Sequence, residues 1–284
     1  MNPYSVEDIV RLALAEDLGP GDITTRLTVP IERQGRAAIV ARGELVISGL
    51  AAAREALRQV DAEAVFKPLA KDGDLLQKGD EIAVIEGRAA SLLSAERVML
   101  NFIMRLSGVA TLTRQYVLAA ANPQVTVVDT RKTTPGLRVL EKAAVLHGGG
   151  GNHRFALYDG ILIKDNHIAA AGGIAQAVES ARAGAAHTLK IEVEVDDLGQ
   201  LKQALEAGAD IIMLDNMGPE LLRQAVKTAG DHFSPAPRGV VLEASGGVNL
   251  QTIAAIAQTG VDLVSVGALT HSAPSVDVGL DWRA

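Results

Sequence analysis

The residues that could do chemistry gather at the ends of short apolar runs in the second half of the chain. Six runs have the length of a buried strand: Val125–Asp129, Ile161–Lys164, Leu189–Val195, Ile211–Asp215, Val240–Ala244 and Leu263–Val266. The polar or glycine residues that end or follow them are Asp129–Lys132, Lys164–His167, Glu192 and Glu194, Asp215 and Asn216, Glu243–Gly247, and Gly267 and Ala268. One such ending is common by chance, whereas six in succession indicate that these groups share one place in the fold.

Basic residues are in excess in the stretch 131–167. It holds six lysines and arginines against three acids, although the whole chain has a formal net charge of -7. A local positive cluster in an acidic chain favours a small anionic ligand in a cleft over a long polyanion. Arginine forks suit carboxylate and phosphate groups, and lysine supplies a point charge.

Glycine-rich segments near these basic residues could bind oxyanions. Gly148–Gly151 precedes His153 and Arg154, and glycine lets backbone N–H groups approach an anion closely. In that setting we interpret His153 as a ligand-binding residue rather than a core or capping histidine. Ser245–Gly247 and Gly267 follow late strands, where α/β barrels often bind phosphate.

Two acids, Glu194 and Asp215, end neighbouring strands beside the expected phosphate site. Carboxylates in that position are costly unless a divalent metal or a sugar hydroxyl lies between them and the phosphate. Mg²⁺ fits, because it prefers hard oxygen ligands and shares substrate phosphates. Glu192 shares a strand face with Glu194, so one of the two could be a structural acid inside the barrel. We favour Glu194 as the functional one.

The alternation of these runs with helical stretches predicts the elements that position the site. Buried strands that alternate with helices form βα units and a parallel sheet. Six or more such units in about 150 residues favour a closed or nearly closed α/β barrel over an open sheet. No glycine-rich dinucleotide motif follows the first strand, which also disfavours the open sheet. All C-terminal strand ends of a parallel barrel lie on one rim, so the six polar endings should meet there.

The first part of the chain mixes short strands with helices. Gly35–Ser48 predicts a strand, Leu50–Val60 a helix, and Ser91–Leu106 a helix that is buried over a wide arc. Lys71–Gly87 has two Gly-Asp turns and predicts a tight β-meander, similar to the turns of lipoyl- and biotinyl-carrier domains. It lacks a modifiable lysine at a hairpin tip, which disfavours a carrier. Farther on, Ser234–Gly239 predicts a loop.

The composition is that of a globular protein, and it excludes several classes of chemistry. Hydrophobic residues make up 48% and charged residues 21% of the 284 residues. Because there is no cysteine, disulfides, thiolate catalysis and iron–sulfur clusters are excluded. The negative net charge argues against binding to nucleic acid or to anionic membrane. No apolar run reaches the roughly 18 residues of a membrane span, and we expect a cytoplasmic protein.

Eight motifs resemble the quinolinate phosphoribosyltransferase family, in the family's order and over nearly the whole chain. They are DTRKTTPG at 129–136, LEKAAV at 140–145, GGGNHR at 149–154, LIKDNH at 162–167, EVEV at 192–195, MLDN at 213–216, EASGGV at 243–248 and VGALTHS at 266–272. The resemblance implies an N-terminal α/β sandwich domain at residues 1–110, which the C-terminal tail could complete. It also implies a seven-stranded, TIM-like α/β barrel at residues 111–284.

The resemblance implies how quinolinate would be bound. Arg131, His153 and Arg154 would bind its two carboxylates, and Lys132 and Lys164 would lie near both substrates. The two lysines would also take part in catalysis. The protein would be a homodimer in which a further arginine, Arg97, reaches across from the other subunit.

The resemblance also implies a site for phosphoribosyl pyrophosphate. Glu194 and Asp215 would hold its ribose hydroxyls and Mg²⁺, and both would be catalytic. Three residues would cradle its 5′-phosphate, namely Ser245, Gly246 and Gly267.

The implied reaction joins quinolinate to phosphoribosyl pyrophosphate and releases pyrophosphate and CO₂, which gives nicotinate mononucleotide for de novo NAD biosynthesis. One alternative is a related phosphoribosyltransferase that does not decarboxylate, either a nicotinate-using enzyme or a homologue associated with molybdenum transport. The Arg131, His153 and Arg154 set, sized for a dicarboxylate, favours quinolinate. A second alternative, from another class, is a carrier or ligand-sensing module built on Lys71–Gly87.

Overall fold

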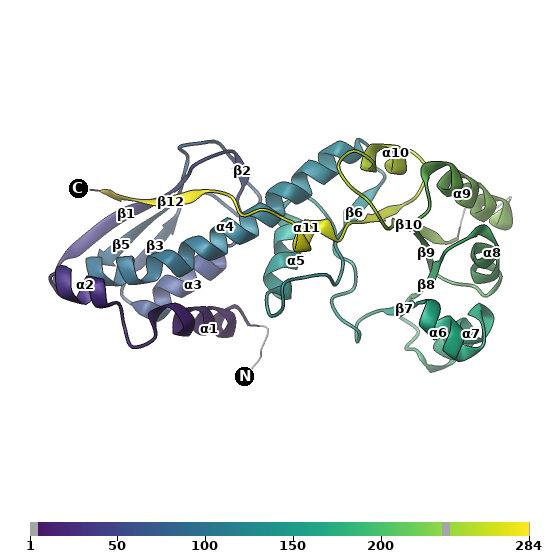
Figure 1. Ribbon diagram of the computed structural model, residues 1–284, viewed down its shortest axis with the longest axis horizontal. Helices are drawn as coiled ribbons and strands as arrows, with labels where there is room; N and C mark the ends of the chain where they lie inside the picture. The colour runs from purple at the N-terminus through teal and green to yellow at the C-terminus, as the bar shows by residue number, and fades with distance from the viewer. Residues whose placement is uncertain (1–4, 235–238, 284) are drawn as a thin grey trace. The chain divides into compact units, whose positions relative to one another are not determined.

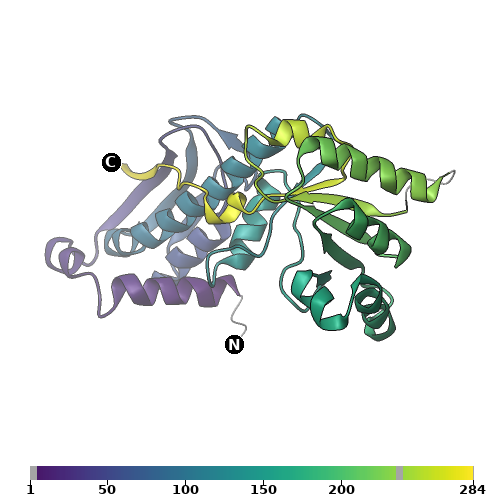
Figure 2. The same ribbon diagram turned by 45° about the vertical axis from the view of Figure 1, so that its right-hand side comes forward.

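The computed structural model describes residues 5–234 and 239–283, and it divides into two compact units. The first unit contains residues 1–114, 133–149 and 269–284, and the second contains residues 115–132 and 150–268. Figures 1 and 2 show the elements of both units from two directions. Each unit is therefore assembled from segments that are distant in the sequence.

The first unit is built on a four-stranded antiparallel sheet. Its order is β12-β1-β5-β3, so the last strand of the chain pairs with the first. These strands are β1 (Gln34–Ala41), β3 (Val65–Pro68), β5 (Glu81–Arg88) and β12 (Val278–Arg283). A separate pair joins β2 (Leu45–Val46) to β4 (Leu75–Leu76).

Helices cover this sheet, and two of them, α3 and α4, run along one of its faces (Figures 1 and 2). The helices that lie wholly or partly in the first unit are α1 (Val6–Leu18), α2 (Ile23–Thr28), α3 (Leu50–Val60), α4 (Ala89–Ala120), α5 (Arg138–His147) and α11 (Ala268–His271). Side-chain caps fix where the first two begin: Ser5 accepts from the Asp8 amide, and Asp22 accepts from the Thr25 amide.

A buried carboxylate anchors the loop that follows Arg131 and Lys132. Glu141 on α5 is fully buried, and it accepts from Arg105 Nη2 at 2.7 Å and from the Thr134 amide at 2.9 Å. Arg105 on α4 also donates to the Ala273 carbonyl at 2.7 Å. This ion pair therefore ties α4, α5, the 133–137 loop and the C-terminal segment of the first unit together.

The second unit is built on a parallel sheet of six strands in the order β6-β11-β10-β9-β8-β7. The strands are β6 (Thr126–Val128), β7 (Ile161–Ile163), β8 (Ile191–Val195), β9 (Ile211–Asp215), β10 (Val241–Ser245) and β11 (Leu263–Ser265). The helices between them are α6 (Asp165–Ala171), α7 (Ile174–Gly184), α8 (Leu198–Glu206), α9 (Pro219–Phe233) and α10 (Ile253–Ala257). This is the predicted alternation of buried strands and helices.

The expected seventh strand is reduced to one bridge. Val128 of β6 forms an isolated parallel bridge with Gly151, in which the Gly151 amide donates to the Val127 carbonyl at 2.8 Å. The run of glycines has low strand propensity, which explains why pairing stops after one residue. The prediction of seven strands is therefore wrong by one for the residues described, and the sheet is barrel-like with a seam between Gly151 and β7.

Other elements differ from expectation mainly at their boundaries. The helix predicted at 50–60 is α3, whereas the helix predicted at 91–106 extends over 89–120. The predicted strand at 35–48 splits into β1 and β2. The meander predicted at 71–87 is wrong, because β4 pairs with β2 and not with β5. The loop predicted at 234–239 falls largely on residues outside those described.

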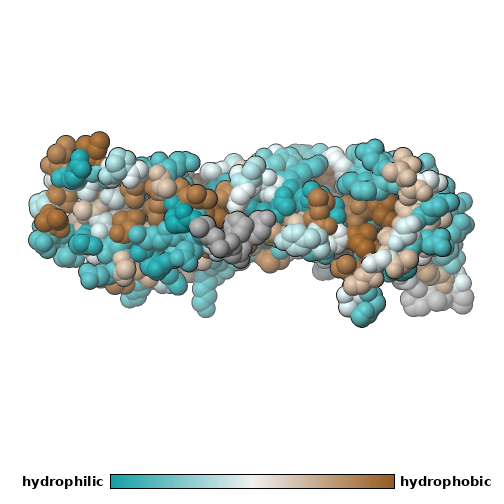
Figure 3. All heavy atoms as spheres, turned by 90° about the horizontal axis from the view of Figure 1, so that it is seen from below, coloured by the Kyte–Doolittle hydropathy of each residue, from teal (hydrophilic) through white to brown (hydrophobic). Residues whose placement is uncertain are grey.

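Apolar side chains also reach the surface. Seen from below, hydrophobic residues form separate patches among hydrophilic ones (Figure 3). Ile23 and Leu27 of α2 and Ile31 after it are 61%, 76% and 77% exposed. None of the helices within residues 5–234 and 239–283 combines the length and the apolar character that a bilayer crossing requires.

Candidate active site

The parallel sheet brings several expected site residues to one edge. Because all six strands run the same way, their C-terminal ends share that edge. Ser245 of β10 is in register with Asp215 of β9, and Lys164 after β7 forms an ion pair with Glu194 of β8. These residues from four strands therefore gather at the carboxyl ends of the strands, as predicted.

The Lys164–Glu194 pair is partly open to solvent. The lysine side chain is 42% exposed and the glutamate side chain 16% exposed. A cation and a carboxylate held together here can each be recruited by a charged ligand, the lysine by phosphate and the carboxylate by a metal or hydroxyl. Next to the pair, His167 Nδ1 accepts from the Lys164 amide at 3.0 Å and so caps α6.

The residues that follow β9 and β10 lie side by side and are linked by hydrogen bonds. The Asn216 amide donates to the Ser245 carbonyl at 2.9 Å, and its side-chain amide donates to Asp215 Oδ2 at 2.7 Å. Gly246 has a φ of +89°, and a Cβ atom there would lie 2.2 Å from Asn216 Oδ1 and 2.9 Å from the Asn216 nitrogen. Only glycine fits this position, which keeps backbone amides accessible to an anion.

A second turn carries the histidine and arginine of the GGGNHR motif. Asp129, fully buried at the end of β6, accepts from the His153 amide at 2.9 Å. Arg154 Nη1 donates to the Gly160 carbonyl at 3.0 Å. Burial, and then the positive charge of Arg131, lower the pKa of Arg154. The two guanidinium groups therefore lie near enough to repel each other.

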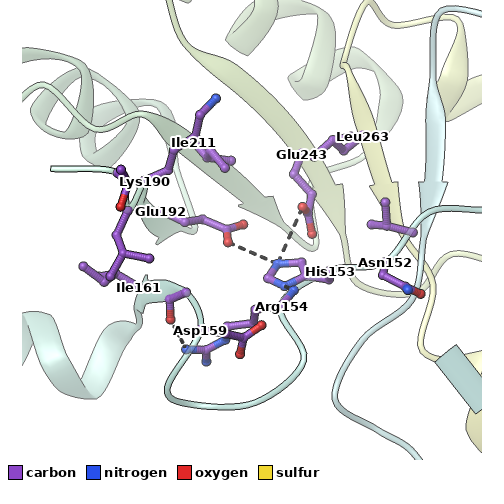
Figure 4. A pocket seen from close by; sticks show the side chains of 14 residues that line it. Asn152, His153, Arg154, Asp159, Ile161, Lys190, Glu192, Ile211, Glu243 and Leu263 are labelled. Carbon is purple, nitrogen blue, oxygen red and sulfur yellow. Dashed lines mark hydrogen bonds and ion pairs between the residues drawn. The ribbon is translucent and has the colours of Figure 1, made fainter. Parts of the chain in front are cut away.

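His153 lies between two buried acids (Figure 4). Its Nε2 atom is 3.1 Å from Glu192 Oε2 and 3.8 Å from Glu243 Oε2, and its Nδ1 atom accepts from the Arg154 amide at 2.7 Å. Glu192 is on β8 and Glu243 is on β10, the two strands on either side of β9. His153 therefore bridges the two glutamates across β9. Both ring nitrogens of His153 thus have partners inside the protein.

Burial and neighbouring charges shift the titration of this cluster. Burial, reinforced by the negative charge of Glu192, raises the pKa of Glu243 to about 7. Burial alone would lower the pKa of His153, but the hydrogen bond with Glu192 and the charge of Glu243 outweigh it, and the net effect raises that pKa. The cluster therefore holds exchangeable protons near neutral pH.

Three further site residues expected from the sequence have few side-chain contacts to describe. Lys132 is exposed, and its amide donates to Thr130 Oγ1 at 3.0 Å. Gly267 directly precedes the four-residue helix α11. Arg97 is exposed on α4 and belongs to the first unit, whereas the other expected site residues belong to the second.

A cavity of about 300 Å³ opens at the other ends of the strands. Its walls include Ile161, Ile211 and Leu263, which begin β7, β9 and β11. Of the expected site residues, His153 and Arg154 reach it (Figure 4). The cavity therefore reaches the His153–Arg154 segment, which Asp129 after β6 also contacts.

Three residues have contacts that the sequence did not predict. Asp129, Glu192 and Glu243 were noted as polar strand endings, and Glu192 also as a possible structural acid. The available signal was an acid on a strand face predicted to be buried, because buried acids are usually paired. Glu192 and Glu243 both meet that criterion.

Comparison with known proteins decides the family. The model of the quinolinate phosphoribosyl transferase C-terminal domain matches residues 109–281, and that of the N-terminal domain matches residues 22–107. The chain belongs to the quinolinate phosphoribosyltransferase family. Its relatives in this family include the probable nicotinate-nucleotide pyrophosphorylase (carboxylating) of Bacillus subtilis, which is 46% identical over 281 residues, or 99% of this chain and 94% of that protein.

Solved structures of the family have the same fold. A nicotinate-nucleotide pyrophosphorylase from Francisella tularensis superposes with a TM-score of 0.89 at 39% identity, covering 98% of this chain and 96% of that one. NadC from Streptococcus pyogenes gives 0.92 at 40% identity, covering 100% and 99%. The α/β fold with a barrel-like parallel sheet and an antiparallel sheet unit is thus that of quinolinate phosphoribosyltransferases.

Proposed function

We propose that the chain is a decarboxylating quinolinate phosphoribosyltransferase, which makes nicotinate mononucleotide from quinolinate and phosphoribosyl pyrophosphate for NAD biosynthesis. Relatives that carry the name nicotinate-nucleotide pyrophosphorylase match it over nearly its whole length. The observation that carries the proposal is the gathering of Lys164, Glu194, Asp215 and Ser245 at one sheet edge. Cations for anionic substrates and carboxylates for a metal and ribose are both needed for this chemistry.

The proposed quinolinate site is built on Arg131, His153 and Arg154. Arg131 and Arg154 supply two guanidinium forks for a pair of carboxylates. Because both nitrogens of the His153 ring are engaged, His153 supports this site from the segment that carries Arg154. Lys132 and Lys164 would lie near both substrates, and Arg97 would come from the other subunit of a homodimer.

The proposed phosphoribosyl pyrophosphate site is built on Glu194 and Asp215, with Ser245, Gly246 and Gly267 around the 5′-phosphate. Glu194 and Asp215 are hard oxygen ligands on adjacent strands, both partly exposed, and they fit Mg²⁺. When bound, Mg²⁺ would neutralise part of the pyrophosphate charge.

In the proposed mechanism the protein mainly positions the reactants and stabilises charge. The pyridine nitrogen attacks the anomeric carbon, whose bond to pyrophosphate breaks, while Lys132 and Lys164 stabilise the leaving charge and the carboxylates stabilise the cationic ribose. The bond between C2 and its carboxylate then breaks, and CO₂ leaves. The electron pair left on C2 is stabilised by the adjacent ring N⁺ and takes up a proton.

The proposed function is tested by one assay with three substrates. Purified protein with phosphoribosyl pyrophosphate and Mg²⁺ should release CO₂ and form nicotinate mononucleotide from quinolinate. Product from nicotinate instead would favour the non-decarboxylating alternative. Absence of turnover together with a mass shift on a lysine would favour a carrier.

The roles of Arg131 and Lys132 are tested by Arg131→Ala and Lys132→Ala. Each should lower turnover by about 10²–10³-fold, the usual cost of removing one well-placed electrostatic donor. Lys202→Ala, at an exposed position of α8, is the matched control and should retain full activity. Near-wild-type turnover in a folded Arg131 or Lys132 variant would contradict the assignment.

We also propose that the protein is a cytoplasmic homodimer. The exposed Ile23, Leu27 and Ile31 side chains offer apolar surface of the kind that subunit interfaces cover. A symmetric dimer would let Arg97 of each subunit serve the site of the other. The absence of cysteine is compatible with a reducing compartment.

A further inference from the structure

Two glutamates are buried together in the second unit. Glu192 is 5% exposed and Glu243 is 1% exposed. Among the described residues, the Oε1 atom of each has no hydrogen-bond partner. Burying two carboxyls with unsatisfied oxygens costs stability, and apolar side chains of the same size would fill the space more favourably. The pair therefore needs a reason other than stability.

Both glutamates contact His153, and the hydrogen bonds of its ring indicate which ring nitrogen carries the proton. The Arg154 amide donates to Nδ1, so Nδ1 is the acceptor and Nε2 carries the proton that points at Glu192 Oε2. Asp129 holds the backbone amide of the same histidine. Three carboxylates therefore hold His153. Glu192 and Glu243 orient its imidazole ring, and Asp129 holds its backbone.

We propose that Glu192 and Glu243 are positioning residues that act through His153: they fix its ring and so direct the neighbouring Arg154 toward a carboxylate of the substrate. This inference rests on the proposed function, and it names two residues of the quinolinate site that do not themselves touch the substrate. The link runs from the carboxyls to the imidazole, and from the imidazole Nδ1 atom to the amide of Arg154.

The two carboxyls have different parts in this arrangement. The groups that face Glu243 are Glu192 on β8, His153, Ser265 on β11 and Lys164 beyond β7, while its in-register neighbours Met213 and Leu263 are apolar. With a pKa raised to about 7, Glu243 is neutral in mildly acidic solution and ionises as the pH rises through 7. Glu192 is the nearer of the two to Nε2, at 3.1 Å against 3.8 Å for Glu243.

The experiment compares Glu192→Gln and Glu243→Gln with Glu206→Gln, an exposed control at the end of α8. Glutamine keeps the size of the side chain but removes its charge. Glu192→Gln should raise KM for quinolinate about 10- to 100-fold, the cost of a hydrogen bond to a charged group, with KM for phosphoribosyl pyrophosphate unchanged. Glu243→Gln resembles the neutral acid, so it should match wild type at about pH 6 and remove a pH dependence centred near 7.

A ligand-independent readout accompanies the kinetics. Nitrogen-15 NMR of the imidazole should show His153 with Nε2–H in the wild type, and a shifted Nε2 resonance in Glu192→Gln, because the group that accepts from Nε2–H has lost its charge. An unchanged spectrum and unchanged KM in Glu192→Gln would overturn the proposal, and so would equal losses for both substrates. Stoichiometric metal bound by His153, Glu192 and Glu243, whose ligand atoms lie within 4.8 Å of one another, would also overturn it.

The kinetic and spectroscopic arms separate two kinds of failure. If the wild-type protein does not turn over quinolinate, the proposed function fails, and with it the link to substrate. The NMR arm then still decides whether the glutamates set the ring of His153. If the wild type is active and Glu192→Gln is normal, the positioning role alone is wrong.

Discussion

At the scale of single residues, the contact between Asn216 after β9 and Gly246 after β10 depends on the absence of a side chain at Gly246. Asn216 has a φ of +55°, a left-handed conformation that asparagine tolerates better than most residues. Its side chain and amide fill the space that a Cβ atom on Gly246 would need. Asn216 and Gly246 therefore constrain each other, and together they shape the proposed phosphate loop.

Gly246→Ala should raise KM for phosphoribosyl pyrophosphate by more than about tenfold, because a Cβ atom displaces Asn216 and distorts the loop amides. Gly247→Ala is the matched control. It also has a positive φ, +62°, but nothing lies within 4 Å of its Cβ position. Both variants should lose about 1 kcal/mol from backbone strain, measured by urea unfolding. Equal KM values for the two variants would contradict a phosphate role for this loop.

Sequence could name residues at the strand ends but not the contacts behind them. Lys164, Glu194 and Asp215 were predicted from the place where each strand ends, a signal that is local in the chain. The contact of His153 with Glu192 and Glu243 joins three segments, and it depends on strand order and register, which no single segment specifies. The sequence favoured Glu194 as the functional acid, and the structure pairs Glu194 with Lys164 and Glu192 with His153.

At the scale of elements, α4 makes a close approach to the C-terminal segment of the first unit. A Cβ atom on Gly108 would lie 2.0 Å from the Pro274 carbonyl oxygen, a backbone atom that cannot rotate away. In the same region the Val276 amide donates to the Met104 carbonyl at 3.1 Å. A glycine in the interior of a long helix is normally unfavourable, so this one is explained by packing.

Gly108→Ala should destabilise the protein by about 1–3 kcal/mol, because overpacking outweighs the better helix propensity of alanine. Gly230→Ala in α9 should change the free energy of unfolding in the opposite direction. Nothing lies within 4 Å of its Cβ position, so alanine should stabilise by roughly 0.5–1 kcal/mol. Chemical denaturation measures the free energy of unfolding of both variants. A stabilising effect of Gly108→Ala would show that the segment around Pro274 moves to make room for the Cβ atom without loss of stability.

The sequence predicted whether most segments form a helix or a strand. It did not predict which strands pair or where the elements begin and end. The six βα strands follow from apolar runs whose length and spacing are encoded locally. The β2–β4 pair joins residues 45–46 to 75–76, and its formation in place of a β-meander is a long-range choice. The prediction of a seventh strand came from the family resemblance, and the glycine run reduces that strand to one bridge.

At the scale of the whole molecule, the proposed dimer makes a complementation prediction. Arg97→Ala and Lys132→Ala should each be inactive as homodimers if every site takes Arg97 from the partner. After unfolding and refolding as an equal mixture, about a quarter of wild-type activity should return, because half of the dimers are mixed and each has one intact site. Size-exclusion chromatography with light scattering should give twice the mass of the 29.6 kDa chain. No recovered activity would place Arg97 outside the neighbouring site.

The pairing of β12 with β1 has a consequence for biosynthesis. The ribosome makes β1 well before β12, so the outer edge of β1 has no partner until β12 has been synthesised. By then every strand of the second unit has already been synthesised. Exposed strand edges invite association between nascent chains. We therefore expect the unit encoded first to mature last, and a chaperone that shields strand edges to increase the yield of native protein.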